Sequence, residues 1–112
     1  MRKVINKHNY FTTMDKEDAL KLAAVYKKLV AQHFNVKDVV LFGSYSKGTQ
    51  TEDSDIDIAV VVDDLKGDYF DYTSLLWKLR RRVSSLIEPV LICPGKDKSG
   101  FWDEIKQTGI LI

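Results

Sequence analysis

The sequence has little of several features that would place it in a special class. It contains one cysteine, Cys93, among 112 residues, which excludes an internal disulfide and fits a reducing compartment. No apolar run approaches the roughly 18 residues that a membrane-spanning helix needs. Residues 1–8 are basic but are not followed by the apolar stretch of a signal peptide. We therefore expect a cytoplasmic protein that is not inserted in a membrane.

The sequence also lacks a strong net charge. It has 17 Lys and Arg against 16 Asp and Glu, for a formal charge of +1, so no overall field marks a nucleic-acid-binding protein. Nucleic acid as a partner and a homo-oligomeric state both stay open. The length predicts a single domain over residues 1–112, with residues 1–11 as a flexible tail or a docking strand.

Hydrophobic periodicity predicts alternating helices and strands. Apolar residues at helical spacing indicate helices at 15–33 and 69–86, one helical turn at 44–47, and a last helix that Ser99 caps and Gly109 ends. Thr12 and Thr13 are candidate caps of the first helix. Aliphatic and β-branched runs indicate strands at 36–42, 55–62 and 88–93, with 110–112 as a short added strand. This order indicates an α/β (α+β) domain built in layers.

Two carboxylates at the start of the second predicted strand suggest a metal site. Asp55 and Asp57 are separated by one residue, so in an extended chain their side chains face the same side. Their Cα atoms would lie about 6.5–7 Å apart. Carboxylates this close repel each other unless a cation lies between them, and oxygen ligands favour a hard ion such as Mg²⁺.

The turn after the first predicted strand suggests a phosphate site. Gly43 lets the backbone approach a ligand closely. Ser44 opens a helical turn and can offer its hydroxyl and neighbouring N–H groups to an anion. A phosphate at this turn and Mg²⁺ at the aspartates together describe a nucleoside triphosphate site.

These motifs resemble a known signature. Gly43-Ser44, Gly48 and the stretch 54–58, Ser-Asp-Ile-Asp-Ile, resemble the DNA polymerase β-like nucleotidyltransferase superfamily. The short chain looks most like its minimal nucleotidyltransferase branch, whose members are often the antitoxin partner of a HEPN-domain toxin. The resemblance implies a mixed sheet with helices mainly on one face. It also implies that Asp55 and Asp57 bind two Mg²⁺ ions and that Gly43 and Ser44 hold the triphosphate of ATP.

A two-metal mechanism calls for a third acid, and Glu88 is the candidate. It begins an otherwise apolar predicted strand, where a carboxylate is costly to bury unless a cation pairs with it. The family more often has aspartate at this position. Glu88 could instead be an exposed strand start or pair with an arginine of residues 80–82. Pro89 beside it predicts an irregular or edge strand.

Lys47 lies where many relatives carry arginine. It would meet a phosphate as a point charge without a bidentate grip, or it is simply solvated. The chain continues for only about 20 residues after the third strand, so we expect another polypeptide or a second copy to hold the acceptor.

The sequence thus predicts an Mg²⁺-dependent enzyme that transfers a nucleoside monophosphate, AMP from ATP, to a hydroxyl of a partner protein such as a HEPN toxin. The catalytic and metal-binding residues would be Asp55, Asp57 and Glu88, with Gly43, Ser44 and Lys47 on the nucleotide. Two alternatives stay open. One is a non-catalytic antitoxin that neutralises its toxin by binding, and the other is transfer to a small molecule such as an aminoglycoside.

Overall fold

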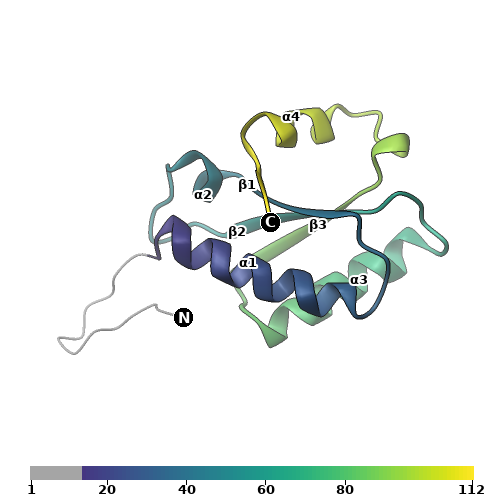
Figure 1. Cartoon of the computed structure of the whole chain (residues 1–112), viewed down its shortest axis with the longest axis horizontal. Helices are drawn as coiled ribbons and strands as arrows, with labels where there is room; N and C mark the ends of the chain where they lie inside the picture. Colours follow the sequence, from purple (N-terminus) through teal and green to yellow (C-terminus); the bar gives the residue numbers. More distant parts are fainter. Residues whose placement is uncertain (1–13) are drawn as a thin grey trace.

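The computed structural model describes residues 14–112. The expectations for the tail at residues 1–11 and for Thr12 and Thr13 fall outside this range. One four-stranded sheet lies between two helical layers (Figure 1). The helices α1 and α3 cover one face and α4 covers part of the other, which matches the predicted α+β class. No helix in the described range is both long and apolar enough to cross a bilayer.

The sheet is mixed, as predicted, with the order β3-β2-β1-β4. β1 runs antiparallel to β2 and to β4, whereas β2 and β3 are parallel and joined through α3. β1, β2 and β4 are one or two residues shorter than the predicted runs, and β3 has the predicted length but begins one residue earlier. The flanking residues Lys37 and Val62 still donate to the neighbouring strands. The bounds of the strands are β1 Asp38–Phe42, β2 Ile56–Val61, β3 Ile87–Ile92 and β4 Ile110–Leu111.

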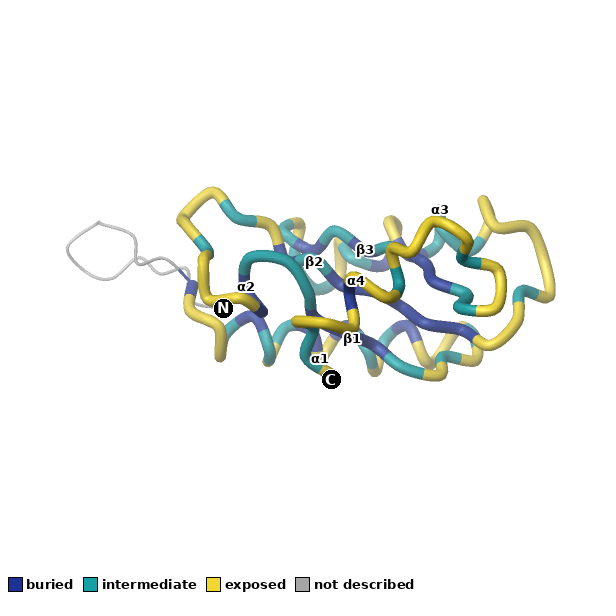
Figure 2. Tube along the Cα trace, turned by 90° about the horizontal axis from the view of Figure 1, so that it is seen from above, coloured by how far each residue is buried: buried dark blue, intermediate teal, exposed yellow. Residues whose placement is uncertain are grey.

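Alternation along the central strands divides the core into two clusters. On β2, Ile56, Ile58 and Val60 face α1 and α3 and belong to the larger cluster. Ala59 and Val61 face the other way and pack beneath α4. Buried residues run along the strands, and exposed ones gather in the turns at both ends (Figure 2). Since β2 is almost fully buried on both faces, the carboxylates at its start, Asp55 just before it and Asp57 as its second residue, are conspicuous.

The first helix, α1, spans Lys16–Ala31 and is capped by Asp15 rather than by a residue of the predicted Thr12-Thr13 pair. The Asp15 carboxylate accepts from the Asp18 N–H at 2.8 Å, and the Asp18 side chain accepts from the Asp15 N–H. This capping box satisfies two N–H groups that the first helical turn would otherwise leave without acceptors.

The predicted helix at 69–86 is wrong in its second half. α3 spans Tyr69–Leu79 and passes into a 3-10 turn, η1, at Arg80–Arg82. The reason is a local network: the Val83 N–H donates to the Arg80 carbonyl at 2.9 Å in a 3-10 turn, and the Ser84 hydroxyl accepts from the Leu86 N–H at 3.1 Å. These bonds turn the chain toward β3, so Val83 and Leu86 reach the core from a turn rather than from a helix.

The remaining short elements follow the prediction more closely. α2 is Ser44–Lys47, as predicted, and Gly109 ends α4, which spans Phe101–Thr108. The N-cap of α4 is Gly100 instead of Ser99. Two side chains before the helix still supply acceptors, because the Asp97 carboxylate accepts from the Trp102 N–H at 2.7 Å and the Ser99 hydroxyl accepts from the Phe101 N–H at 3.1 Å. A second 3-10 turn, η2, occupies Pro94–Lys96.

One buried hydrogen bond joins the two helices on the α1 face and yields a stability prediction. The hydroxyl of fully buried Tyr26 donates to the Leu76 carbonyl at 2.7 Å. We expect Tyr26→Phe to lower the free energy of unfolding by about 1 kcal/mol, because the donor is lost without a change in packing. Urea denaturation measures this. Tyr69→Phe is the control, since Tyr69 is half exposed, and an equal loss there would contradict the assignment.

Candidate active site

Strand register places the predicted acids side by side. Asp57 of β2 pairs with Phe42 of β1 on one side and with Glu88 of β3 on the other. Asp55 lies just before β2 and is exposed, whereas Asp57 and Glu88 are partly buried. The fold therefore brings together all three predicted acids, two from one strand and one from its parallel neighbour.

The acids lie on the same face of the sheet as α4. Asp57 alternates with Ile56 and Ile58, which face α1 and α3, so its side chain points to the opposite side. α4 covers only part of that side, over Ala59 and Val61. The ring of Phe101, at the start of α4, contacts the ring of Phe42 edge-on with centroids 5.8 Å apart. Phe42, which pairs with Asp57 in the ladder, thus contacts the first residue of α4.

Burial and neighbouring carboxylates raise the pKa values of Asp57 and Glu88. Partial burial raises the pKa of Asp57 to about 6, and the charges of Glu88 and Asp55 add to the rise. Burial also raises the pKa of Glu88, together with the charge of Asp55 and a side-chain hydrogen bond to it, while the Arg80 guanidinium opposes the rise. Like charges that raise one another's pKa values form a site that gains by binding a cation.

The donor set suits a hard divalent ion, although the side chains do not form a finished cage. Within residues 14–112, no three carboxylate, thiol or imidazole groups are arranged so that one ion could bind all of them at once. Mg²⁺ commonly takes one or two protein carboxylates and fills its octahedron with water and phosphate oxygens. Mutually repelling oxygens from Asp55, Asp57 and Glu88 fit that pattern.

The predicted glycine-serine turn lies directly against the acids. Gly43 has φ +77°, and a Cβ built on it would overlap the Asp57 carboxylate, with the Asp57 Cγ at 3.1 Å. Only glycine lets the β1–α2 turn approach this carboxylate. Ser46, which the sequence analysis missed, is buried and donates from its hydroxyl to the Gly43 carbonyl at 2.9 Å. This hydrogen bond stabilises the conformation of the β1–α2 turn.

The other two predicted nucleotide residues lie on α2. Ser44 is its first residue and is half-buried, and Lys47 is its last and is exposed. The Lys47 N–H donates to the Gly43 carbonyl at 3.1 Å. The N–H groups of a first helical turn have no acceptor within the helix, so they and the Ser44 hydroxyl remain available beside the carboxylates.

Arg80 is the second residue near the site that sequence reasoning did not identify. The sequence analysis kept open an ion pair between Glu88 and one of residues 80–82. In the structure Arg80 instead donates through Nη1 to the carbonyls of Ser85 and Ile87, the latter at 3.2 Å. These hydrogen bonds stabilise the turn that leads into Glu88. The positive charge of Arg80 opposes the rise in the pKa of the Glu88 carboxyl. The hydrogen-bond partners of Arg80 are backbone carbonyls, and because every residue has one, the sequence does not indicate which residues Arg80 will contact.

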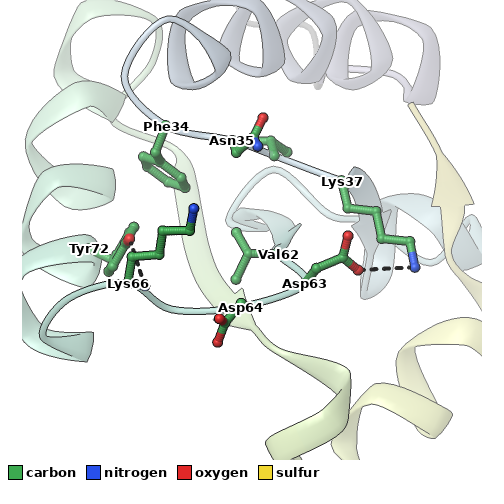
Figure 3. A pocket seen from close by; sticks show the side chains of 9 residues that line it. Phe34, Asn35, Lys37, Val62, Asp63, Asp64, Lys66 and Tyr72 are labelled. Carbon is green, nitrogen blue, oxygen red and sulfur yellow. Dashed lines mark hydrogen bonds and ion pairs between the residues drawn. The ribbon is translucent and has the colours of Figure 1, made fainter.

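A separate cavity lies at the other end of the sheet. It has about 340 Å³ and is lined by residues from the loops at 34–37 and 62–66 and by Tyr72 (Figure 3). Lys37, which pairs with Asp63 at 3.3 Å, precedes the first residue of β1. The acids lie beside the last residue of β1, about 16 Å away along the strand. This cavity is separate from the candidate active site.

The pKa of Asp57 gives a prediction for the metal-free protein. Its folded pKa of about 6 lies above the ordinary 3.8, so the folded state binds the proton more tightly and loses stability as pH rises between these values. We expect Asp57→Asn to be more stable than the parent above pH 6, by about 1 kcal/mol after solvent screening, and to lose that advantage near pH 4.

Thermal unfolding across pH 4–8, with and without Mg²⁺, measures this difference. Mg²⁺ should raise the midpoint of the parent more than that of Asp57→Asn. Asp53→Asn, in the exposed loop before β2, is the matched control and should follow the parent. A pH-independent difference between parent and Asp57→Asn would contradict the assignment.

Known proteins are similar to this chain in sequence. A Methanocaldococcus jannaschii protein provisionally named protein adenylyltransferase MJ0604 is 44% identical over 80 residues, which is 66% of this chain and 75% of the relative. Another from the same organism, provisionally named protein adenylyltransferase MJ1379, is 51% identical over 39 residues. That match spans 35% of this chain and 39% of MJ1379, so the chain covers only about two fifths of the length of that relative.

Solved structures share the fold. A crystal structure from Sulfolobus solfataricus, provisionally described as a nucleotidyltransferase, matches with a TM-score of 0.63 and 26% identity over 86% of this chain and 80% of that one. A toxin–antitoxin structure with AMP-PNP matches with a TM-score of 0.52 and 23% identity over 88% and 72%. At that identity, the second match shows the fold alone.

The resemblance seen in the sequence is confirmed by a family model. The model of the nucleotidyltransferase domain matches residues 24–108, a range that includes Gly43, Ser44 and all three acids. Since this match covers most of the chain and MJ0604 is matched over three quarters of its length, the chain belongs to the nucleotidyltransferase domain family, with relatives named as protein adenylyltransferases.

Proposed function

We propose that the protein transfers AMP from ATP to a hydroxyl group of a partner protein, with Mg²⁺ as the required ion. One observation carries the proposal: the register that sets Asp57 beside Glu88 also brings the Gly43 turn against the Asp57 carboxylate. A group of acids that can hold a cation and a helical turn whose first N–H groups can donate to phosphate are thereby adjacent. Nucleotidyl transfer needs this adjacency, because the acceptor hydroxyl, the α-phosphate and the departing pyrophosphate must all lie within one small volume.

Each residue of the site has a role in this proposal. The Ser44 hydroxyl and the first N–H groups of α2 donate to phosphate oxygens, and Gly43 lets this turn approach the Asp57 carboxylate. Lys47 supplies a positive charge from the last turn of α2. The carboxylate of Glu88 accepts the proton of the acceptor hydroxyl as the new P–O bond forms and the bond to pyrophosphate breaks.

Asp55, Asp57 and Glu88 are the residues that would hold Mg²⁺. When bound, the ion neutralises charge on the phosphoryl oxygens and lowers the pKa of the attacking hydroxyl. The raised pKa values of Asp57 and Glu88 support this assignment, because carboxylates that repel one another gain most from a shared cation.

The open part of the α4 face supports a macromolecular acceptor. α4 spans only Phe101–Thr108 and packs over Ala59 and Val61, so the acids lie beyond the part of the sheet that it covers. An acceptor held by its own fold can complete the site from outside. The name protein adenylyltransferase, carried by relatives such as MJ0604, and the shared fold with a toxin–antitoxin structure support a HEPN-type toxin as that acceptor.

A transfer assay tests the proposal. The purified chain is incubated with α-labelled ATP, Mg²⁺ and the protein encoded by the neighbouring reading frame. Label should move to that protein, and Asp55→Asn with Asp57→Asn should abolish the transfer. Glu88→Gln should slow it by about 10²–10⁴-fold, as expected for loss of a general base. Asp53→Asn should retain the parent rate.

The outcomes separate the alternatives. If the double aspartate variant still neutralises the partner in cells, the chain acts as a binding antitoxin without catalysis. If label moves to an aminoglycoside but not to the protein, the acceptor is a small molecule. Either result would refute transfer to a protein as the function.

Two glycine variants test the phosphate turn without a partner. Gly43 and Gly48 both have φ +77°, but Gly43 at ψ −150° lies in a region that only glycine adopts readily, whereas Gly48 at ψ 19° is in the αL region, so alanine is more strained at position 43. A Cβ on Gly43 would meet the Asp57 carboxylate, whereas one on Gly48 has nothing within 4 Å. We expect Gly43→Ala to weaken binding of Mg²⁺ with a non-hydrolysable ATP analogue by more than about tenfold, about 1.4 kcal/mol, and Gly48→Ala to weaken it less.

Isothermal titration calorimetry measures both affinities, and circular dichroism establishes that each variant is folded. Equal losses for the two glycine variants would contradict a role of the Gly43 turn and its contact with Asp57 in binding.

A further inference from the structure

The outer side of α3 is an exposed aromatic surface. Three of the six large apolar side chains exposed within residues 14–112 lie on this helix, namely Tyr69, Phe70 and Trp77. Phe70 is 73% exposed and Trp77 is 38% exposed. Exposed aromatic side chains gathered on one element mark an interaction surface more often than scattered ones do.

These side chains form a continuous stripe. Phe70, Ser74, Trp77 and Arg81 follow one another at spacings of four, three and four residues, and all four are exposed. Such spacing places Phe70, Ser74 and Trp77 on one side of α3, and Arg81 follows in the η1 turn. The opposite side of α3 is already occupied, because Leu76 and Leu79 are buried in the larger core cluster. We call the exposed set, with its charged neighbours Asp68, Asp71 and Lys78, the α3 stripe.

Trp77 is held in position in the absence of a partner. The Arg80 guanidinium lies over its ring at 4.5 Å from the centroid. Arg80 is itself fixed by hydrogen bonds to the carbonyls of Ser85 and Ile87. An aromatic side chain that is already ordered loses little conformational entropy on binding, which favours its use as an anchor.

The charges along the α3 stripe decide which partner fits. Asp68 and Asp71 lie at its N-terminal end, and Lys78 and Arg81 lie at its C-terminal end. When such a helix is turned end for end, its acidic end faces the basic end of the original. The stripe is therefore complementary to itself in the antiparallel sense, which is the requirement for a twofold interface.

The helical rise gives the register. With 1.5 Å per residue, Phe70 lies about 6 Å from Ser74 toward the N-terminus and Trp77 about 4.5 Å toward the C-terminus. A twofold axis at Ser74 would thus bring Phe70 within about 1.5 Å, along the axis, of Trp77 in the second copy. Asp71 would lie at the same level as Lys78 of that copy. The small side chain of Ser74 allows close approach where the helices cross.

From this self-complementarity we infer that two copies of the chain associate through their α3 stripes, antiparallel and with Ser74 at the twofold axis. The inference is independent of the proposed transfer reaction. The acids lie on the face of the sheet opposite α3, so both active sites of such a dimer would remain open. A protein acceptor could then bind each copy without displacing the other.

Charge reversal tests the inference. Sedimentation velocity on the purified chain should show a mass that approaches twice that of the monomer as concentration rises. Asp71→Lys alone and Lys78→Asp alone each place like charges across the twofold axis and should weaken the dimer by more than about tenfold. The double variant restores opposite charges and should regain the parent dimerisation constant to within about threefold. Lys28→Asp, exposed on α1, is the control.

Cross-linking supplies a second measurement. In a Cys93→Ser background, Ser74→Cys should form a disulfide-linked dimer under mild oxidation, because the two positions meet at the axis. Lys28→Cys should not. Circular dichroism and thermal unfolding establish that each variant is folded.

Three results would overturn the inference: a parent chain that stays monomeric at all concentrations, a folded double variant that fails to regain dimerisation, or Ser74→Cys that cross-links no faster than Lys28→Cys. If the α3 stripe binds a different protein, the parent chain alone would be monomeric, and Trp77→Ala would no longer bind that protein. That result also excludes the dimer.

Discussion

The candidate site depends on the register in which β2 pairs with its two neighbours. The pairing of Asp57 with Phe42 and Glu88 is the same pairing that buries Ile56, Ile58 and Val60 against the helices. A slip by one residue would turn these apolar side chains to the open face and bury Asp57 in the core. The hydrophobic effect therefore fixes the position of the carboxylates, although the carboxylates are not part of the apolar core.

The same arrangement makes the site electrostatically costly in the absence of ligands. Asp57 and Glu88 lie side by side with Asp55 close enough to raise both pKa values. The core holds them there because two helices and three strands pack beneath and beside them. Strain of this kind is common at functional sites, where a fold keeps like charges together for a ligand that will separate them.

The sequence predicted those parts of the structure that local pattern determines. The aspartate pair, the Gly43-Ser44 turn and the three main strands follow from alternation and from the chemistry of single residues. The helix predicted to 86 was too long because Val83 and Leu86 continue the apolar period of α3. The sequence offers no sign that Ser84 and Arg80 would bond to the backbone and turn the chain.

Ser46 and Arg80 were missed for a related reason. Both side chains donate hydrogen bonds to backbone carbonyl groups. Because a carbonyl is present at every residue, no pair of side-chain types in the sequence predicts such a hydrogen bond. The third acid was found because Glu88 interrupts an apolar strand. Its neighbour Pro89 was expected to mark an irregular or edge strand, and β3 is indeed at the edge of the sheet.

That position of Pro89 has a consequence for how the protein behaves when concentrated. The outer side of an edge strand offers a row of N–H and C=O groups to any extended chain that approaches. Proline has no N–H to give, so β3 has a gap in its hydrogen-bonding potential near its middle. At the other edge, β4 is only two residues long. Growth of the sheet by adding strands from other molecules is therefore hindered on both sides, which protects an acid-bearing strand from being drawn into fibrils.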